Sequence, residues 1–218
     1  MTSTFLRSFV LGCWLISSSL FAAAQRFRAI VPYVNEGGKL IVSLKVNGQQ
    51  GRFLLDTGAP CCVSHEFASR IGLKAGEMRT GEDSNGRAVQ ASLVSLDSLQ
   101  LGAVTFRNIQ AMQWEKGNPT AQLIDGILGY NLLRMGIVKW DTRQRQFIFT
   151  TLTEGLGLDP SRALSLLPND YVPMVAVRLG KNDTDTVMFD SGAEGFYEMS
   201  NRQRERLTQS RSTARILA

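Results

Sequence analysis

The chain has 218 residues, of which 44% are hydrophobic and 20% are charged. This composition is typical of a folded globular protein and excludes a disordered chain. The net charge is +5, but the basic residues are spread along the sequence, and the Arg-rich stretch at 202–215 has no aromatic platform or binding motif beside it. These features favour a solvated surface over nucleic-acid binding.

The N-terminus has the pattern of a targeting segment. Arg7 supplies a positive charge, residues 8–21 are mostly apolar, and an A-x-A cleavage signal ends at Ala24. The apolar run is shorter than the roughly 20 residues that a membrane-spanning helix needs. We therefore expect residues 1–24 to be a cleaved signal peptide, the mature protein to be secreted or periplasmic, and no membrane attachment to remain after cleavage.

An apolar hairpin leads into an acidic turn. Residues 40–46 alternate as a strand, an Asn-Gly turn follows, and residues 51–55 return toward Asp56. Desolvating a carboxylate at the end of an apolar strand is unfavourable, so the site must offset the loss of free energy. Thr57 offers a hydroxyl that can brace a neighbouring group, and Gly58 permits a tight turn and close backbone approach.

Two cysteines, Cys61 and Cys62, follow the acidic turn. A disulfide between sequence neighbours is geometrically awkward, so two small packed thiols are predicted. Ser64 is then expected to cap a short, exposed helix that ends at Gly72.

The following region predicts further strands. Residues 77–89 are polar and predict a hairpin, either mobile or an ordinary surface hairpin, with its turn at Ser84, Asn85 and Gly86. Ile127, Leu128 and Gly129 suit a buried strand that passes close to another backbone. Short strands are also predicted at 93–96, 99–101, 105–106, 109–114, 137–140 and 146–150, a spacing typical of an all-β sandwich or barrel.

After a connector at 151–172, the first pattern repeats. Residues 175–180 align with 42–47 and, with one inserted residue, 187–190 align with 53–56. The second unit therefore also ends an apolar strand in an acid, Asp190, followed by Ser191 and Gly192. A further helix, 200–207, roughly matches 66–73.

Together these residues resemble the pepsin/retropepsin-type aspartic proteases, in their bacterial secreted form. The resemblance is carried by Asp56-Thr57-Gly58, Asp190-Ser191-Gly192 and Ile127-Leu128-Gly129, in that family's order, with the polar hairpin in the place of its flap. It implies an all-β fold: a retropepsin-like acid-protease β-barrel lobe with short helices over residues 25–150, then a partial, truncated second lobe over residues 173–218.

The resemblance also implies a chemistry. Two carboxylates that share one proton can activate water and protonate a peptide carbonyl, so neither metal nor cofactor is expected. Asp56 and Asp190 would form this catalytic pair, with a peptide or protein as the substrate. By the same resemblance, the dyad would be supported by Thr57, Gly58, Ser191 and Gly192, and the flap residues Gly81, Ser84, Asn85 and Gly86 would close over the peptide.

The second unit lacks counterparts of the polar hairpin and of residues 127–129. Three explanations stay open: a fragment of a longer chain, a decayed second lobe, or a homodimer in which each copy contributes Asp56. His65, the sole histidine, lies at the start of the helix expected to be exposed, which disfavours serine, cysteine and zinc hydrolases. The alternative function is a non-catalytic peptide- or glycan-binding module that kept the protease fold.

Overall fold

The computed structural model describes residues 26–82, 88–179, 183–193, 195, 197, 199, 201, 204, 205 and 208. The predicted signal peptide, the turn residues Ser84, Asn85 and Gly86, and most of the helix expected at 200–207 lie outside these residues. Within the described ranges, no helix combines the length and apolarity needed to cross a bilayer.

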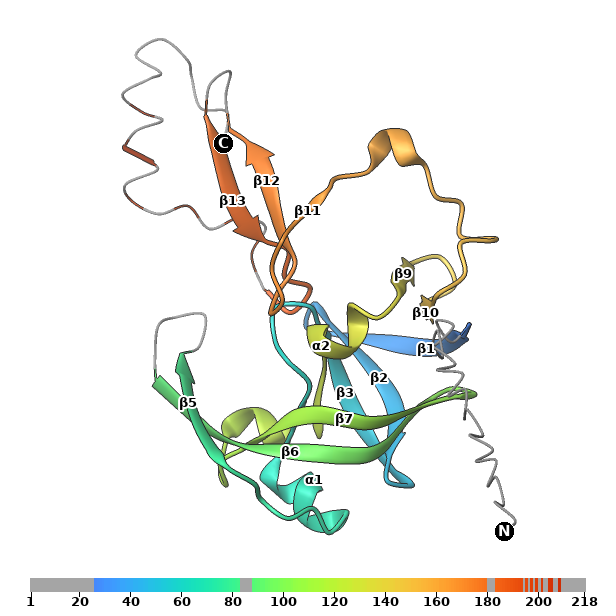
Figure 1. Cartoon of the computed structure of the whole chain (residues 1–218), viewed down its shortest axis with the longest axis vertical. Helices are drawn as coiled ribbons and strands as arrows, with labels where there is room; N and C mark the ends of the chain where they lie inside the picture. Colours follow the sequence, from blue (N-terminus) through green and yellow to red (C-terminus); the bar gives the residue numbers. More distant parts are fainter. Residues whose placement is uncertain are drawn as a thin grey trace, which may run out of the picture.

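The fold is all-β, as predicted, with a large and a small sheet (Figure 1). The large sheet has ten strands in the order β5-β6-β7-β4-β8-β3-β2-β1-β10-β9, and the small one has three in the order β11-β12-β13. The large sheet is formed by β1 (Arg28–Glu36), β2 (Lys39–Val46), β3 (Gln49–Asp56), β4 (Cys62–Val63), β5 (Met78–Glu82), β6 (Ala88–Leu101), β7 (Val104–Trp114), β8 (Gly126–Gly129), β9 (Ile137–Asp141) and β10 (Gln146–Thr150). The small sheet is formed by β11 (Leu166–Leu167), β12 (Met174–Arg178) and β13 (Thr184–Met188). The helices are α1 (His65–Arg70), α2 (Tyr130–Leu133) and the 3₁₀ turns η1 (Pro119–Gln122) and η2 (Pro160–Arg162).

The β2–β3 hairpin follows from the sequence pattern. Its Asn47-Gly48 turn has positive φ at both positions, 49° and 84°, which is the geometry of a tight two-residue turn. Alternate residues of β2 are buried, and β3 buries three consecutive apolar residues ahead of Asp56. The hairpin thus anchors the acidic turn directly in the hydrophobic core.

The segments predicted as short strands between 93 and 114 form one long hairpin, β6–β7. The pairing keeps one register on both sides of Asp97, from Leu96–Ile109 to Ser98–Arg107, where the sequence suggested a break. A polar side chain on the solvent face interrupts the apolar pattern but not the backbone ladder.

Helix α1 begins where the sequence predicts. Ser64 caps it through its hydroxyl, which accepts a hydrogen bond of 3.0 Å from the Phe67 amide. Phe67 is fully buried and packs edge-to-face on Phe53 of β3 at 5.5 Å between ring centroids. His65, expected on an exposed helix, is half-buried instead, because its Nδ1 lies 3.3 Å from the Gln113 amide of β7.

Strand β8 runs parallel to β3 and antiparallel to β4, with Gly129 opposite Asp56. A side chain at Gly129 would overlap the backbone of Pro60 and Cys61. Glycine is therefore required here, because two backbones pass in contact beside the acidic turn.

The β12–β13 hairpin reproduces the β2–β3 hairpin and projects away from the large sheet (Figure 1). Val175 pairs with Val187 as Val42 pairs with Phe53, so the aligned positions of the two repeats occupy the same register. Strand β11, within the expected connector, adds an edge to this hairpin.

Candidate active site

The two acidic turns meet face to face. Asp56 ends β3, and Asp190 follows β13 by two residues. A Cβ added to Gly58 would lie 2.5 Å from Cγ of Asp190, and one added to Gly192 would lie 2.5 Å from Cγ of Asp56. Each carboxyl thus lies against the glycine of the opposite turn, which no larger residue would allow.

Hydrogen bonds join the two turns reciprocally. The Thr57 amide donates to Oγ of Ser191 at 3.1 Å, and the Ser191 amide donates to Oγ1 of Thr57 at 3.0 Å. Each hydroxyl also donates to the strand leading to the opposite acid: Thr57 to the Phe189 carbonyl at 2.6 Å and Ser191 to the Leu55 carbonyl at 3.1 Å. Since all four bonds are partly buried, they fix the turns with little freedom.

Each glycine also orients its own acid. The Gly58 amide donates to Oδ1 of Asp56 at 2.8 Å, and the Gly192 amide donates to Oδ1 of Asp190 at 2.7 Å. Both carboxyls are therefore held in a fixed rotamer, each with one oxygen engaged by the backbone of its own turn.

The electrostatics of the pair favour a shared proton. The pKa of Asp56 is raised from 3.8 to about 6, first by burial and then by the negative charge of Asp190 and a hydrogen bond with it. The Gly58 amide and the charge of Lys39 act in the opposite direction. A carboxyl with this pKa can hold or release a proton in weakly acidic solution.

Lys39, a residue that the sequence analysis did not select, lies beside the pair. Its Nζ donates a hydrogen bond to the Gly192 carbonyl in the second acidic turn. Its position could have been predicted from the two-residue Asn-Gly turn, because the length of that turn fixes which residues of the hairpin pair. Ile41 pairs with Leu54, so extending that register by two residues brings Lys39 level with Asp56.

Of the residues predicted for a flap, the structure describes Gly81. It pairs with Val89 in the β5–β6 hairpin. Strand β5 is an edge of the large sheet, separated from β3 by β6, β7, β4 and β8. Ser84, Asn85 and Gly86 lie outside the described residues.

Cys61 and Cys62 are both buried and form no disulfide. Cys61 accepts a hydrogen bond of 3.3 Å from the Gly129 amide, and Cys62 donates one of 3.3 Å to the Pro60 carbonyl. Burial raises the pKa of Cys61 to about 11 and that of Cys62 to about 12. Neither thiol therefore has the reactivity of a nucleophile near neutral pH.

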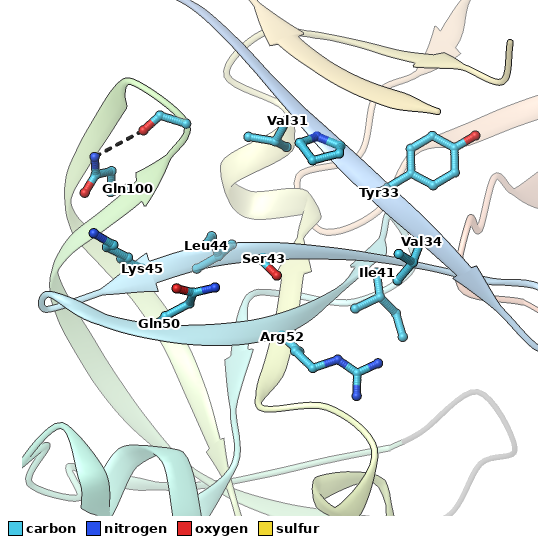
Figure 2. A pocket seen from close by; sticks show the side chains of 12 residues that line it. Val31, Tyr33, Val34, Ile41, Ser43, Leu44, Lys45, Gln50, Arg52 and Gln100 are labelled. Carbon is cyan, nitrogen blue, oxygen red and sulfur yellow. Dashed lines mark hydrogen bonds between the residues drawn. The ribbon is translucent and has the colours of Figure 1, made fainter. Parts of the chain in front are cut away.

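A hollow of about 430 Å³ lies over β1, β2 and β3 (Figure 2). It is lined by polar side chains such as Lys45, Gln50 and Gln100 beside apolar ones such as Val31 and Ile41. No residue of either acidic turn lines it, so this hollow is separate from the paired carboxyls. Among the described residues, no group of three or more His, Cys, Asp or Glu side chains is placed to hold a metal ion.

Comparison with known proteins finds a similarity within the first unit. A sequence model described as aspartyl protease matches residues 42–132, which contain Asp56 and Gly129. The matched segment is less than half of the chain, so it shows a similarity to the aspartyl proteases. The matched segment covers the first acidic turn, while Asp190 lies beyond it.

Two solved structures also resemble the chain. One is a retropepsin-like aspartic protease from Rickettsia conorii, 20% identical with a TM-score of 0.42, over 58% of this chain and 91% of that one. The other is an aspartic proteinase from Irpex lacteus, 16% identical with a TM-score of 0.37, over 60% of this chain and 39% of that one. A search of curated protein sequences returned no significant match.

Proposed function

We propose that this protein is an aspartic endopeptidase that hydrolyses peptide bonds with water activated by Asp56 and Asp190. The observation that carries the proposal is the reciprocal contact of the two carboxyls, each against the glycine of the opposite turn. The aspartyl protease match over the first unit supports it independently. Since the contact forms within one chain, it supports an intrachain pair over a pair of Asp56 residues from two copies.

The pair would act with a single proton. The ionised carboxyl takes a proton from water as the water oxygen bonds to the scissile carbonyl carbon, and the protonated carboxyl gives its proton to the carbonyl oxygen. The amide nitrogen then receives a proton from the pair and the C–N bond breaks. As the carboxylic acid forms, a hydroxyl of the tetrahedral intermediate gives its proton to the pair, which returns to its singly protonated state. The proton belongs to the pair, so neither acid has a fixed role.

The hydrogen bonds between the turns would keep this geometry before substrate binds. A rigid pair needs no reorganisation in the transition state, which is the main source of electrostatic catalysis. Peptides and proteins are the proposed substrates, and the polar β5–β6 hairpin is the proposed flap. The proposed location is outside the cytoplasm, secreted or periplasmic, on the strength of the predicted signal peptide.

The test is digestion of an unfolded protein substrate across acidic pH, with and without pepstatin. We expect pepstatin-sensitive cleavage that is lost in both Asp56→Asn and Asp190→Asn. Asp97→Asn is the matched control, because this aspartate is exposed on β6. Cleavage that persists in Asp56→Asn would reject the proposal, and peptide binding without cleavage, unchanged by Asp56→Asn, would favour the binding module.

A further inference from the structure

We infer that Lys39 is a positioning residue of the acid pair, which binds the backbone of the second acidic turn and places a positive charge near Asp56. This inference deepens the proposed function and rests on it, since it concerns the protonation of the same two acids. It is carried by the contact of the Lys39 ammonium with the Gly192 carbonyl. Gly192 is also the residue whose amide holds Asp190, at 2.7 Å.

The location of Lys39 is built into the hairpin. It is the first residue of β2 and is half-buried, so its side chain is confined near the end of β3. The register of β2 and β3 is continuous, from the Val46–Gln49 pair at the turn to the Ile41–Leu54 pair near the open end. The position of each residue along the hairpin is therefore fixed. A cation at this position is therefore held level with Asp56 by the backbone itself.

The second repeat has no such cation. Its register continues from the pair Met174–Met188 to a hydrogen bond of 2.8 Å from the Phe189 amide to the Pro173 carbonyl. One step further, Val172 is the counterpart of Lys39. The two acidic turns share three matching pairs of hydrogen bonds but differ in charge at this position, so Lys39 breaks the symmetry of the pair.

The positive charge of Lys39 affects the protonation of Asp56. The groups that face Asp56 are Asp190, Lys39 and the buried thiol of Cys62, which carries no charge at acidic pH because its pKa is about 12. Lys39 is the positive member of this set and lowers the pKa of Asp56 against burial and the neighbouring acid. A nearby cation favours the singly ionised pair over the fully protonated one. Lys39 would thereby extend the working range of the pair toward lower pH.

The decisive experiment is an NMR titration of the aspartate carboxyl carbons, with Asp56 and Asp190 assigned from their Asn variants. In Lys39→Met we expect Asp56 to titrate at a pH higher by roughly 0.5 to 1. Lys39→Gln separates charge from tether, because its amide can still donate to the Gly192 carbonyl; it should show the same shift. Lys39→Arg should titrate like the wild type.

Lys45→Met is the matched control, since Lys45 is an exposed residue of the same strand and should leave the titration unchanged. An Asp56 titration that is the same in Lys39→Gln and the wild type would overturn the inference, whether or not Lys39→Met folds. Because the titration needs no turnover, it remains decisive if the wild type proves inactive and the proposed function fails.

Activity gives a second readout. If the protein cleaves peptides, both limbs of the pH profile of kcat/KM should move to higher pH in Lys39→Gln and stay in place in Lys39→Arg. If Lys39 had only a structural role, its substitution would lower kcat/KM at every pH without shifting the limbs of the pH profile. A uniformly lowered profile with unmoved limbs would therefore contradict the inference.

Discussion

Thr57 and Ser191 exchange hydrogen bonds across 134 residues of sequence, each amide donating to the other's hydroxyl at 3.1 and 3.0 Å. The hydroxyl of each acidic turn therefore accepts a hydrogen bond from the backbone of the other turn. Neither turn has a complete set of hydrogen bonds unless both repeats are in place. The stability of the fold and the geometry of the site depend on the same few groups.

The first prediction concerns the Thr57 hydroxyl. In Thr57→Val we expect the free energy of unfolding to fall by about 2–3 kcal/mol, because the Ser191 amide and the Phe189 carbonyl both lose a partner in a partly buried site. Urea unfolding followed by tryptophan fluorescence would measure it. Thr186→Val, at an exposed position of β13, is the control and should change little. Equal stabilities of the two variants would count against this account.

The second prediction concerns the glycines between the acids. A methyl group at Gly58 or Gly192 would press on the opposite carboxyl. We expect Gly58→Ala and Gly192→Ala each to cost about 1–3 kcal/mol of stability, as overpacking does, and to lower peptide cleavage at least about a hundredfold by moving the acids apart. Gly195→Ala is the control, because a Cβ there meets nothing within 4 Å. Wild-type cleavage by Gly192→Ala would contradict the observed closeness.

The third prediction follows from the raised pKa of Asp56. Below pH 3.8 the folded and unfolded states are both protonated, so the burial of Asp56 carries no ionisation penalty. As the pH rises to about 6, the unfolded state ionises first and the folded state is destabilised, by at most about 3 kcal/mol. Asp56→Asn removes this loss.

The measurement compares unfolding free energies of Asp56→Asn and the wild type at about pH 3.5 and about pH 7. We expect the variant to gain stability relative to the wild type at the higher pH. Asp97→Asn should show no such gain, since Asp97 is exposed. A difference that does not depend on pH would show that Asp56 ionises as freely in the folded state as in the unfolded one.

The fourth prediction concerns the thiols. Cys61 and Cys62 are 1% and 6% exposed, and burial raises both pKa values. We expect no reaction with a disulfide reagent at mildly alkaline pH in the native protein and reaction of both thiols in urea. Cleavage activity should survive the native treatment. Rapid native labelling at either position would mean that the segment after the acidic turn opens to solvent.

Much of the fold could be predicted because the sequence pattern is local. The Asn-Gly turn, the alternation in β2 and the Ser64 cap each depend on neighbours in the chain, and the structure has all three. The long β6–β7 hairpin was divided into short strands, because exposed polar residues hide a continuous ladder from a pattern based on hydrophobicity.

The candidate site likewise has residues that could be predicted from the sequence and residues that could not. The repeat indicates that Asp56 and Asp190 are equivalent positions, and equivalence led us to expect that they meet. The position of Lys39 beside the acids could not be found in this way, because its counterpart in the second repeat is Val172 and a repeat indicates only what the two units share. The half-burial of His65 depends on Gln113, a residue of β7 far along the chain, which no local pattern reveals.

The parallel pairing of β3 with β8 has a consequence for the order in which the molecule is made. Asp56 lies opposite Gly129, so its turn takes its final shape only after 73 further residues have been synthesised, and its partner acid emerges later still. A nascent chain that ends before Asp190 thus carries no assembled pair. Any hydrolytic power would appear only when synthesis has passed the second repeat.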